Sequence, residues 1–347
     1  MIPLDENKDH LDALCDYFAL GKRMRPAFSV RGGFHHFMWD VHTANGRYAI
    51  KQLAPDTDLD DCDVIRHYET AESVSEAFSR CGVPALHALG AGDNALQVIE
   101  NCGYLIYPWT NARALRRDEI DVIHIHQIAG IFARMHGAVL KIEGLRSPQS
   151  ESDPEAKLEV LLKFAQSRNS SRNEDIREHL PLFENILSRA EIASAELSSR
   201  KVVSHGDLDH KNVLWDSSQD PLLIDWESTQ YVNPAHEVIL EALDWSGITL
   251  DFKENLFDCF VDQYLSAGGQ IHQNEIEAAF ACVEGDWVNW LMYNLGRSID
   301  RDDEKQRRIG LEQVDLALVA ILHLQRVVPR LLSKLNPRSR ANVNRLK

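Results

Sequence analysis

Apolar and polar residues alternate over short segments in the first third of the chain and recur at helical spacing in the rest. Alternation between turn residues predicts β-strands, whereas a spacing of three or four predicts helices. The predicted strands cover 28–30, 37–43, 47–53, 97–100 and 104–107, with an amphipathic helix within 1–25 and another over 64–80. The first part of the chain is therefore predicted to be rich in sheet.

Helical spacing dominates the second part. The predicted helices cover 118–140, 155–166, 176–199, 234–245, 255–266, 274–299 and 311–335. We expect Pro329 to interrupt the last helix, because proline lacks the N–H that a helix interior needs. The pattern predicts an α+β protein with an N-terminal lobe over 1–107, a hinge over 108–111 and a mainly helical C-terminal lobe over 112–347.

Charge and composition limit the kinds of molecule that the protein is expected to bind. The chain has 347 residues, a net charge of −16 and six cysteines without a CxxC pair. Nucleic-acid-binding proteins are usually basic, so that class is disfavoured. The first residues lack the apolar core of a signal peptide, and no apolar run approaches the length that spans a bilayer. We therefore expect a cytoplasmic protein with reduced thiols and no membrane partner. The acidic charge would suit a cationic small molecule, although ordinary solubility explains it equally well.

The most informative motif is a polar loop that follows a short apolar segment. It carries His205-Gly206-Asp207, then Asn212 five positions after Asp207 and Asp225 thirteen positions after Asn212. Phosphoryl transfer needs a carboxylate for the proton of the acceptor hydroxyl and oxygen ligands that hold magnesium on the nucleotide phosphates. The spacing thus indicates Asp207 as base and Asn212 and Asp225 as Mg²⁺ ligands. Taken singly, a helix cap, a turn residue and a strand end are the favoured interpretations of these three residues. Taken together with their spacing, the phosphotransfer roles are favoured.

A hairpin would bring the two proposed metal ligands together. Residues 212–215 and 221–224 are predicted to be short strands joined by a polar turn. Such a hairpin would place Asn212 and Asp225 at the same end, where one cation could bridge them.

The sheet-rich part supplies candidate nucleotide ligands. Gly32 and Gly33 lie between two predicted strands, where the backbone could approach phosphates or form a plain hairpin turn. Lys51 lies near the end of a strand and could reach the phosphates, although most strand lysines are simply solvated. A glutamate of the helix over 64–80 should pair with Lys51, and Glu72 is favoured over Glu69.

The predicted hinge offers a second kind of nucleotide contact. The segment 104–109, which includes Tyr107 and Trp109, is expected to present backbone groups to a purine edge. The alternative is an edge strand that ends at Pro108.

These motifs together resemble the aminoglycoside phosphotransferase and choline kinase-like family, small-molecule kinases that share the protein-kinase fold. The resemblance runs from about Phe28 to about Trp245. It is carried by Gly32-Gly33-Phe34, Ala49-Ile50-Lys51, Tyr107-Pro108-Trp109, Arg134-Met135-His136-Gly137, the loop from His205 to Asn212, and Ile224-Asp225-Trp226-Glu227. It implies a two-lobed fold, ATP or GTP as co-substrate with Mg²⁺, Asp207 as base, Asn212 and Asp225 as metal ligands, and Lys51 as phosphate ligand with Glu72 as its partner.

In such folds the acceptor binds between the catalytic loop and the later helices. Carboxylates interleaved with aromatic residues suit a cationic or sugar-like ligand. The candidates are Asp209, Asp244, Trp245, Glu284, Asp286, Trp287, Trp290 and Tyr293. Trp287, Trp290 and Tyr293 could instead form a core stripe, which is favoured. Asp209 is favoured to be a cap or to face solvent.

The leading prediction is a small-molecule O-phosphotransferase that acts on a hydroxyl group. The acceptor could be an aminoglycoside-like antibiotic, or a metabolite such as an amino alcohol, a sugar or homoserine. A protein kinase is disfavoured because no long activation segment ending in Ala-Pro-Glu follows Asp225. A non-catalytic nucleotide-binding protein is disfavoured because Lys51, Asp207, Asn212 and Asp225 are all present.

Overall fold

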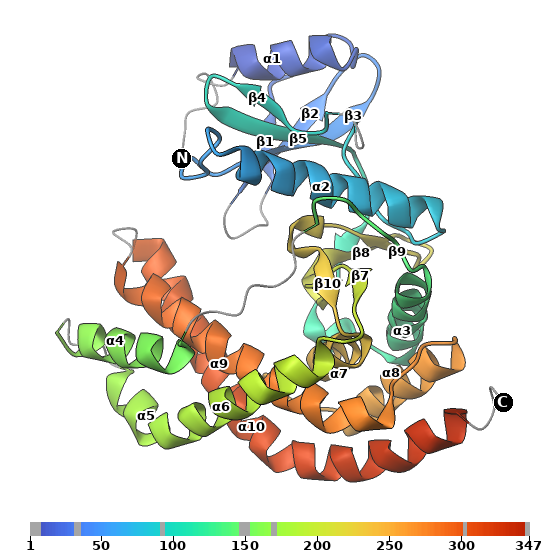
Figure 1. Cartoon of the computed structure of the whole chain (residues 1–347). Helices are drawn as coiled ribbons and strands as arrows, with labels where there is room; N and C mark the ends of the chain where they lie inside the picture. The colour runs from blue at the N-terminus through green and yellow to red at the C-terminus, as the bar shows by residue number, and fades with distance from the viewer. Residues whose placement is uncertain are drawn as a thin grey trace. The chain divides into compact units, whose positions relative to one another are not determined.

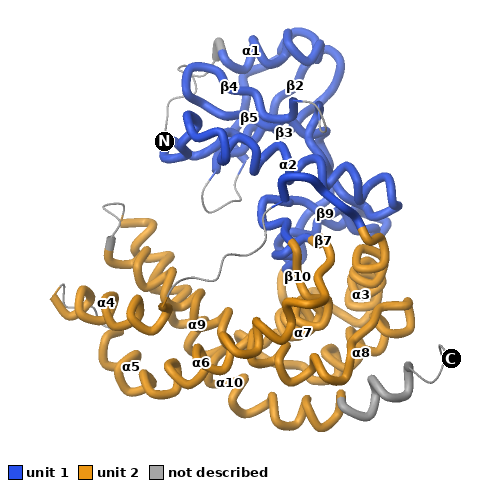
Figure 2. Tube along the Cα trace, viewed as in Figure 1, with its two compact units in different colours: residues 1–115, 140–146, 205–230 blue, residues 116–139, 147–204, 231–347 orange. Residues whose placement is uncertain are grey.

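The computed structural model describes residues 8–30, 36–90, 94–145, 153–167, 172–300 and 304–343. The fold is a mixed α+β one, with an antiparallel sheet in the N-terminal region and helices in the C-terminal part, as predicted (Figure 1). Two compact units can be distinguished by their internal contacts (Figure 2). Unit 1 comprises Met1–Leu115, Leu140–Arg146 and His205–Gln230, and unit 2 comprises Arg116–Val139, Ser147–Ser204 and Tyr231–Lys347. The segment with the His-Gly-Asp motif thus belongs to the same unit as the N-terminal sheet.

The main sheet of unit 1 has five strands. Their order is β1 (Phe28–Val30), β2 (Phe37–His42), β3 (Arg47–Gln52), β5 (Cys102–Pro108) and β4 (Gln97–Ile99), and every neighbouring pair is antiparallel. Helix α1 (Lys8–Tyr17) and helix α2 (Cys62–Arg80) lie on opposite faces of this sheet (Figure 1).

The alternation of side chains along the strands explains which face each residue occupies. Ile50 and Ile106 pack with Leu14 in the core beneath α1. Leu105, the next residue along β5, packs with Tyr68 of α2 on the other face. Because successive side chains of a strand point to opposite faces, Lys51, which pairs with Leu105, faces α2.

A smaller sheet carries the strand that leads into the Asp-Trp-Glu motif. It consists of β6 (Arg113–Ala114), β8 (Val213–Trp215) and β9 (Pro221–Leu223). Leu223 donates its N–H to the carbonyl of Pro84 at 2.7 Å, and Leu86 donates to the carbonyl of Leu223 at 2.9 Å. These backbone bonds attach the motif to the segment that follows α2.

Unit 2 is mainly helical. Helix α9 (Ile276–Asp300) packs against α4 (Pro154–Ser167), α6 (Leu180–Leu197), α7 (Pro234–Trp245) and α10 (Glu304–Val343). Helix α3 (Val122–Gly137) packs on α8 (Glu254–Ser266), and α5 (Asn173–Glu178) precedes α6. Strands β7 (Val202–Ser204) and β10 (Gln230–Val232) form a two-stranded sheet.

Three predicted helices differ in the structure. The segment 176–199 is divided into α5 and α6, and α3 begins only at Val122 after a short turn at Arg117–Glu119. Helix α10 continues through Pro329 instead of being interrupted there. Val327, Val328 and Leu331 around the proline are buried, so packing offsets the hydrogen bond that proline cannot make.

Helix α10 also departs from the expectation that no apolar run is long enough to span a bilayer. By length and composition alone, its stretch Glu304–Leu335 could cross a membrane. The same stretch packs against α9, and Ala317, Ile321 and Leu324 are fully buried. In all, 39% of the most apolar window of this stretch is buried inside the structure.

Candidate active site

The His-Gly-Asp loop is held against the Asp-Trp-Glu segment. The buried His205 donates from Nε2 to the carbonyl of Ile224 at 3.0 Å, and its ring centre lies 4.6 Å from that of Trp226. Gly206 has φ of +79°, and a Cβ there would lie 2.2 Å from the carbonyl oxygen of Ser228. Glycine is therefore required both by the backbone conformation and by the close approach of the two segments.

Asp207 and Asn212 are joined within this loop. The Nδ2 of Asn212 donates to the backbone oxygen of Asp207 at 2.7 Å and to its Oδ2 at 3.1 Å. Ile224 donates its N–H to the carbonyl of Asn212 at 3.0 Å, so the residue before Asp225 is tied to Asn212. Because the amide nitrogen of Asn212 is used by Asp207, its oxygen is the atom that a cation would take.

Asp225 forms an ion pair with Lys51. Its Oδ1 lies 2.9 Å from the Nζ of Lys51, a residue 174 positions earlier in the chain. Asp225 has φ of 64° and ψ of 61°, a left-handed conformation that costs energy for a residue other than glycine. Trp226, stacked on Phe78 of α2 at 5.4 Å between ring centres, anchors the segment that holds this conformation.

Glu227 is a further site residue, and sequence reasoning gave it no role. Its carboxylate pairs with the Nζ of Lys51, beside Asp225. The signal was present in the motif Asp225-Trp226-Glu227, where two acids flank a buried tryptophan. A one-residue spacing lets both carboxylates reach one ammonium because the intervening side chain points into the core.

The charges of this cluster stabilise one another. Burial alone would lower the pKa of Lys51, but Asp225 and Glu227 outweigh it, so the pKa lies above its usual value. Burial would raise the pKa of Glu227, yet Lys51 and His36 lower it to about 2. The site therefore carries a charged ammonium between two carboxylates at neutral pH.

The predicted pairing of Lys51 with Glu72 is not what the structure shows. Glu72 accepts hydrogen bonds from the hydroxyl of Tyr107 and from the N–H of Ala88, both at 2.6 Å. Glu69 accepts from the N–H groups of residues 95 and 96 instead. Asp225 and Glu227 form the ion pairs with Lys51, whose charge also acts to lower the pKa of Glu72. A role of Glu72 beside Lys51 in nucleotide binding stays a prediction.

The buried carboxyl group of Glu72 predicts that the stability of the protein depends on pH. Glu72 is only 4% exposed, and burial raises its pKa to about 7. The folded protein thus holds this proton more tightly than the unfolded chain, so stability from this group is full below pH 4.5 and declines as pH rises towards 7. We expect Glu72→Gln to gain about 3 kcal/mol in unfolding free energy relative to the wild type between pH 4.5 and 8, measured by urea denaturation. Glu76→Gln, one turn further along α2, is the matched control. A difference between variant and wild type that stays constant with pH would contradict the prediction.

The other nucleotide candidates are in varied settings. Gly32 and Gly33 lie outside the described residues. The indole of Trp109 is covered by the guanidinium of Arg47 at 3.7 Å from the ring centre, and its Nε1 donates to Asn111 at 3.0 Å. Tyr107 turns its hydroxyl towards Glu72, as described above. The contact of segment 104–109 with a purine stays a prediction.

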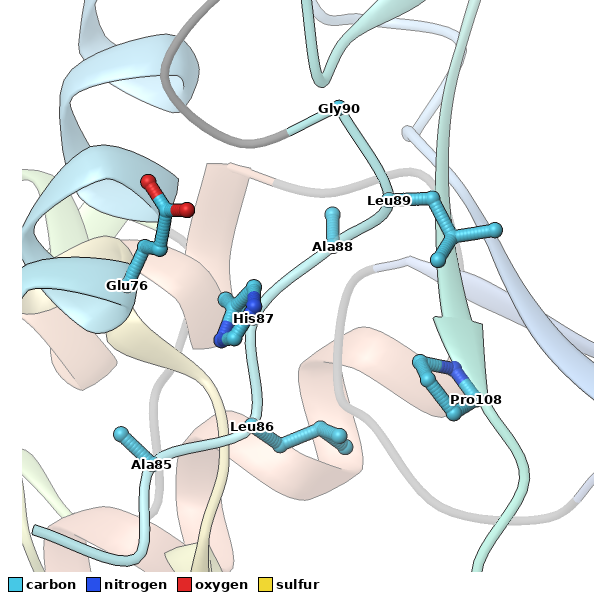
Figure 3. Close-up of a pocket in the computed structure, with 8 residues that line it drawn as sticks. All are labelled: Glu76, Ala85, Leu86, His87, Ala88, Leu89, Gly90 and Pro108. Carbon is cyan, nitrogen blue, oxygen red and sulfur yellow. The ribbon is translucent and has the colours of Figure 1, made fainter. Parts of the chain in front are cut away.

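A cavity of about 230 Å³ lies beside Pro108 at the end of β5 (Figure 3). Its wall is the backbone segment that runs between α2 and β5, and Pro108 closes one side. Leu89 of that segment donates to the carbonyl of Ile106 at 2.8 Å, which fixes the wall to β5. The lining residues are Glu76, Ala85, Leu86, His87, Ala88, Leu89, Gly90 and Pro108.

Most of the predicted acceptor residues have protein partners. Asp209 caps the turn at His210–Asn212 and pairs with Lys211 at 2.7 Å. Asp244 pairs with Arg117 at 2.9 Å. Glu284, which is 3% exposed, accepts from Arg189 at 2.8 Å and from Gln325 at 2.6 Å. These carboxylates are engaged in cap and ion-pair roles, and any contact with an acceptor stays a prediction.

The aromatic residues of α9 separate into two groups. Trp287 packs against the helical core, as the core-stripe interpretation expects. Trp290 and Tyr293 are instead 41% and 54% exposed, and their rings stack at 5.5 Å with an interplanar angle of 19°. Asp286, one turn before Trp290, is half exposed and accepts from His236 at 2.6 Å. An acid and two stacked rings thus share one exposed face of α9.

Comparison with known proteins gives a family and several structural neighbours. A model of the phosphotransferase enzyme family matches residues 29–278. No curated protein sequence matches the chain with significance. A spectinomycin phosphotransferase solved with ADP and spectinomycin has a TM-score of 0.67 at 14% identity, over 91% of this chain and 98% of that one. An ethanolamine kinase of Plasmodium vivax has a TM-score of 0.59 at 15% identity, over 90% and 89%. An amicoumacin kinase solved with AMP-PNP and Ca²⁺ has a TM-score of 0.60 at 9% identity, over 90% and 96%.

Proposed function

Because the chain belongs to the phosphotransferase enzyme family, we propose that it moves the γ-phosphoryl group of ATP or GTP to a hydroxyl group of a small molecule in a Mg²⁺-dependent reaction. The observation that carries this proposal is the Lys51–Asp225 ion pair at 2.9 Å, beside a loop in which Asn212 is bonded to Asp207. Residues far apart in sequence thus form one group of charges within a single compact unit. The roles follow the chemistry of each side chain.

Asp207 is proposed to accept the proton of the acceptor hydroxyl as the oxygen attacks phosphorus. The hydrogen bond from Asn212 to its Oδ2 orients the carboxylate for that role. Lys51 is proposed to hold nucleotide phosphates, for which its secured positive charge is suited. Correct alignment supplies much of the rate enhancement in such reactions, since little covalent chemistry is asked of the protein.

The donor atoms suit Mg²⁺. The oxygen of Asn212 and the carboxylate of Asp225 are hard oxygen ligands, and Lys51 occupies only Oδ1 of Asp225. When bound, the ion would neutralise the charge that develops on the transferring phosphoryl group. The hydrogen bond from Lys51 to Oδ1 orients the carboxylate of Asp225, which supports this role.

The exposed face of α9 supports a cationic acceptor. The stacked rings of Trp290 and Tyr293 offer faces that attract an ammonium group, and the carboxylate of Asp286, which is paired with His236, lies on the same face. The ethanolamine kinase among the structural neighbours is named for an amino alcohol, a molecule with both a hydroxyl and an ammonium group. We therefore propose an amino alcohol or a larger hydroxylated amine, such as an aminoglycoside-like antibiotic, as acceptor, with a neutral sugar or homoserine as alternatives.

A coupled turnover assay tests this proposal. The purified protein with Mg²⁺ and either ATP or GTP would be offered amino alcohols, aminoglycosides, neutral sugars and homoserine in parallel. Turnover with amines and not with neutral sugars is the expected result. Turnover with neutral sugars alone would overturn the cationic acceptor and leave the phosphotransferase intact. Magnesium-dependent nucleotide binding without any turnover would favour a non-catalytic nucleotide-binding protein.

Trp290→Ala tests the acceptor surface separately. We expect the KM of the cationic acceptor to rise about two- to fivefold, because a cation–π contact at an exposed site contributes about 0.5–1 kcal/mol, while the KM of the nucleotide stays unchanged. Ile192→Ala on α6 is a suitable control, since Ile192 is also exposed but lies on another helix. An unchanged acceptor KM in Trp290→Ala would remove this face from the acceptor site.

A further inference from the structure

The ring of His36 has defined partners at both nitrogens. Its Nδ1 accepts the N–H of Ala54 at 3.0 Å. Because a backbone N–H can only donate, the ring proton must lie on Nε2, which faces Oε2 of Glu227 at 3.2 Å. The side chain of His36 is only 10% exposed, so this arrangement is shielded from water. A backbone group thus selects the tautomer that donates to Glu227.

Glu227 connects His36 to Lys51. One carboxylate oxygen of Glu227 faces His36, and the other forms the ion pair with the Nζ of Lys51. Asp225 contacts the same ammonium from a second direction. A continuous series of contacts therefore runs from the backbone of Ala54 through His36 and Glu227 to Lys51, and all of it lies in unit 1.

We propose that His36 is a positioning residue for nucleotide binding: its Nε2–H holds the carboxylate of Glu227, and through it sets the place of the Lys51 ammonium. This rests on the proposed function, in which Lys51 holds the phosphates. His36 acts through Glu227 and contacts neither the phosphates nor the acceptor hydroxyl.

The choice of histidine fits this role chemically. A neutral imidazole donates one hydrogen bond and leaves the negative charge of Glu227 to Lys51. An arginine or lysine would compete with Lys51 for that charge. Without the hydrogen bond, the flexible glutamate could turn away, and Lys51 would keep Asp225 as its main partner. Displacements of about 1 Å at such groups reduce rates strongly, so the position of Glu227 matters even though it does not react.

Two amide variants separate the two nitrogens of His36. The amide of His36→Asn can replace Nδ1 towards Ala54 but is too short to reach Glu227, whereas His36→Gln can place an N–H near the position of Nε2. We expect His36→Asn to raise the KM of the Mg²⁺-nucleotide about tenfold with an unchanged acceptor KM, and His36→Gln to recover most of that loss. Tyr68→Phe is the control, because it removes the hydroxyl that lies 3.4 Å from the same nitrogen and leaves the Glu227 contact intact.

A double-mutant cycle with Glu227→Gln gives the decisive measurement. If His36 acts through Glu227, the effects of His36→Asn and Glu227→Gln on nucleotide KM are not additive, and the double variant resembles the worse single variant. Additive effects, or a nucleotide KM of His36→Asn equal to that of the wild type, would overturn the positioning role. Turnover by the wild-type protein would still support the proposed function in that case. Absence of nucleotide binding by the wild type would instead contradict the proposed function. Thermal unfolding of each variant shows whether a KM change merely follows lost stability.

The tautomer can be checked without any activity. Nitrogen-15 NMR of the His36 ring in the unmodified protein is expected to show the proton on Nε2. A proton on Nδ1 would overturn the inference, whatever the turnover assay shows.

Discussion

Replacing Asp207 by asparagine is expected to lower turnover by about a thousandfold while Mg²⁺-nucleotide still binds. A positioned general base contributes roughly a hundredfold to ten-thousandfold, and an amide cannot accept the proton of a hydroxyl under these conditions. The substitution keeps the shape of the side chain, and the 2.7 Å bond from Asn212 reaches the backbone oxygen of residue 207, which the substitution leaves in place. The loop should therefore keep its conformation.

The measurement is steady-state turnover with a saturating acceptor, combined with calorimetric titration of the nucleotide. Asp216→Asn is the matched control, because Asp216 accepts backbone hydrogen bonds in the turn between β8 and β9, and asparagine can accept them too. Turnover of Asp207→Asn within a few-fold of the wild type would remove Asp207 as the base and require another proton acceptor.

Asp225→Asn is expected to weaken the Mg²⁺-dependent binding of the nucleotide. The variant removes a proposed anionic ligand of the ion and one of the two carboxylates that hold Lys51. We expect the Mg²⁺ concentration for half-maximal activity to rise at least about tenfold and kcat/KM to fall about a hundredfold. Lys51 keeps Glu227 as a partner, so we expect the folded structure to persist.

Activity measured across a series of Mg²⁺ concentrations tests this expectation. Asp220→Asn, immediately before β9, changes the same residue type a few positions away and serves as control. If the activity of Asp225→Asn relative to the wild type is the same at every Mg²⁺ concentration, Asp225 is not a ligand of the ion. Its contribution then comes from the ion pair with Lys51.

The parts of the site that depend on local spacing could be predicted from sequence. The two short strands around 213–223 follow from apolar runs separated by a turn, and the structure ties Asn212 to the residue before Asp225. The direction of Lys51 follows from alternation along β3. The helix predicted over 234–245 has the same bounds as α7, which Asn233 caps and Pro234 begins.

The parts of the site that depend on contacts between segments distant in sequence could not be predicted from sequence. Spacing alone did not indicate that the hydroxyl of Tyr107 and the N–H of Ala88 bind the carboxylate of Glu72, or that Glu227 forms an ion pair with Lys51. The acid at Glu284 looked available for an acceptor, although its ion pair with Arg189 joins α6 and α9. Periodicity also could not separate Trp287 in the core from Trp290 on the surface, since one helical turn carries both.

The discontinuous make-up of unit 1 has a consequence for recombination between relatives. Lys51 and its counterions come from segments of unit 1 that are separated in the chain by residues 116–139 and 147–204 of unit 2. A single crossover after residue 115 would join Lys51 and His36 of one parent to the acids at positions 225 and 227 of the other. Chimaeras in this family should therefore work best when residues 205–230 are inherited together with the N-terminal sheet.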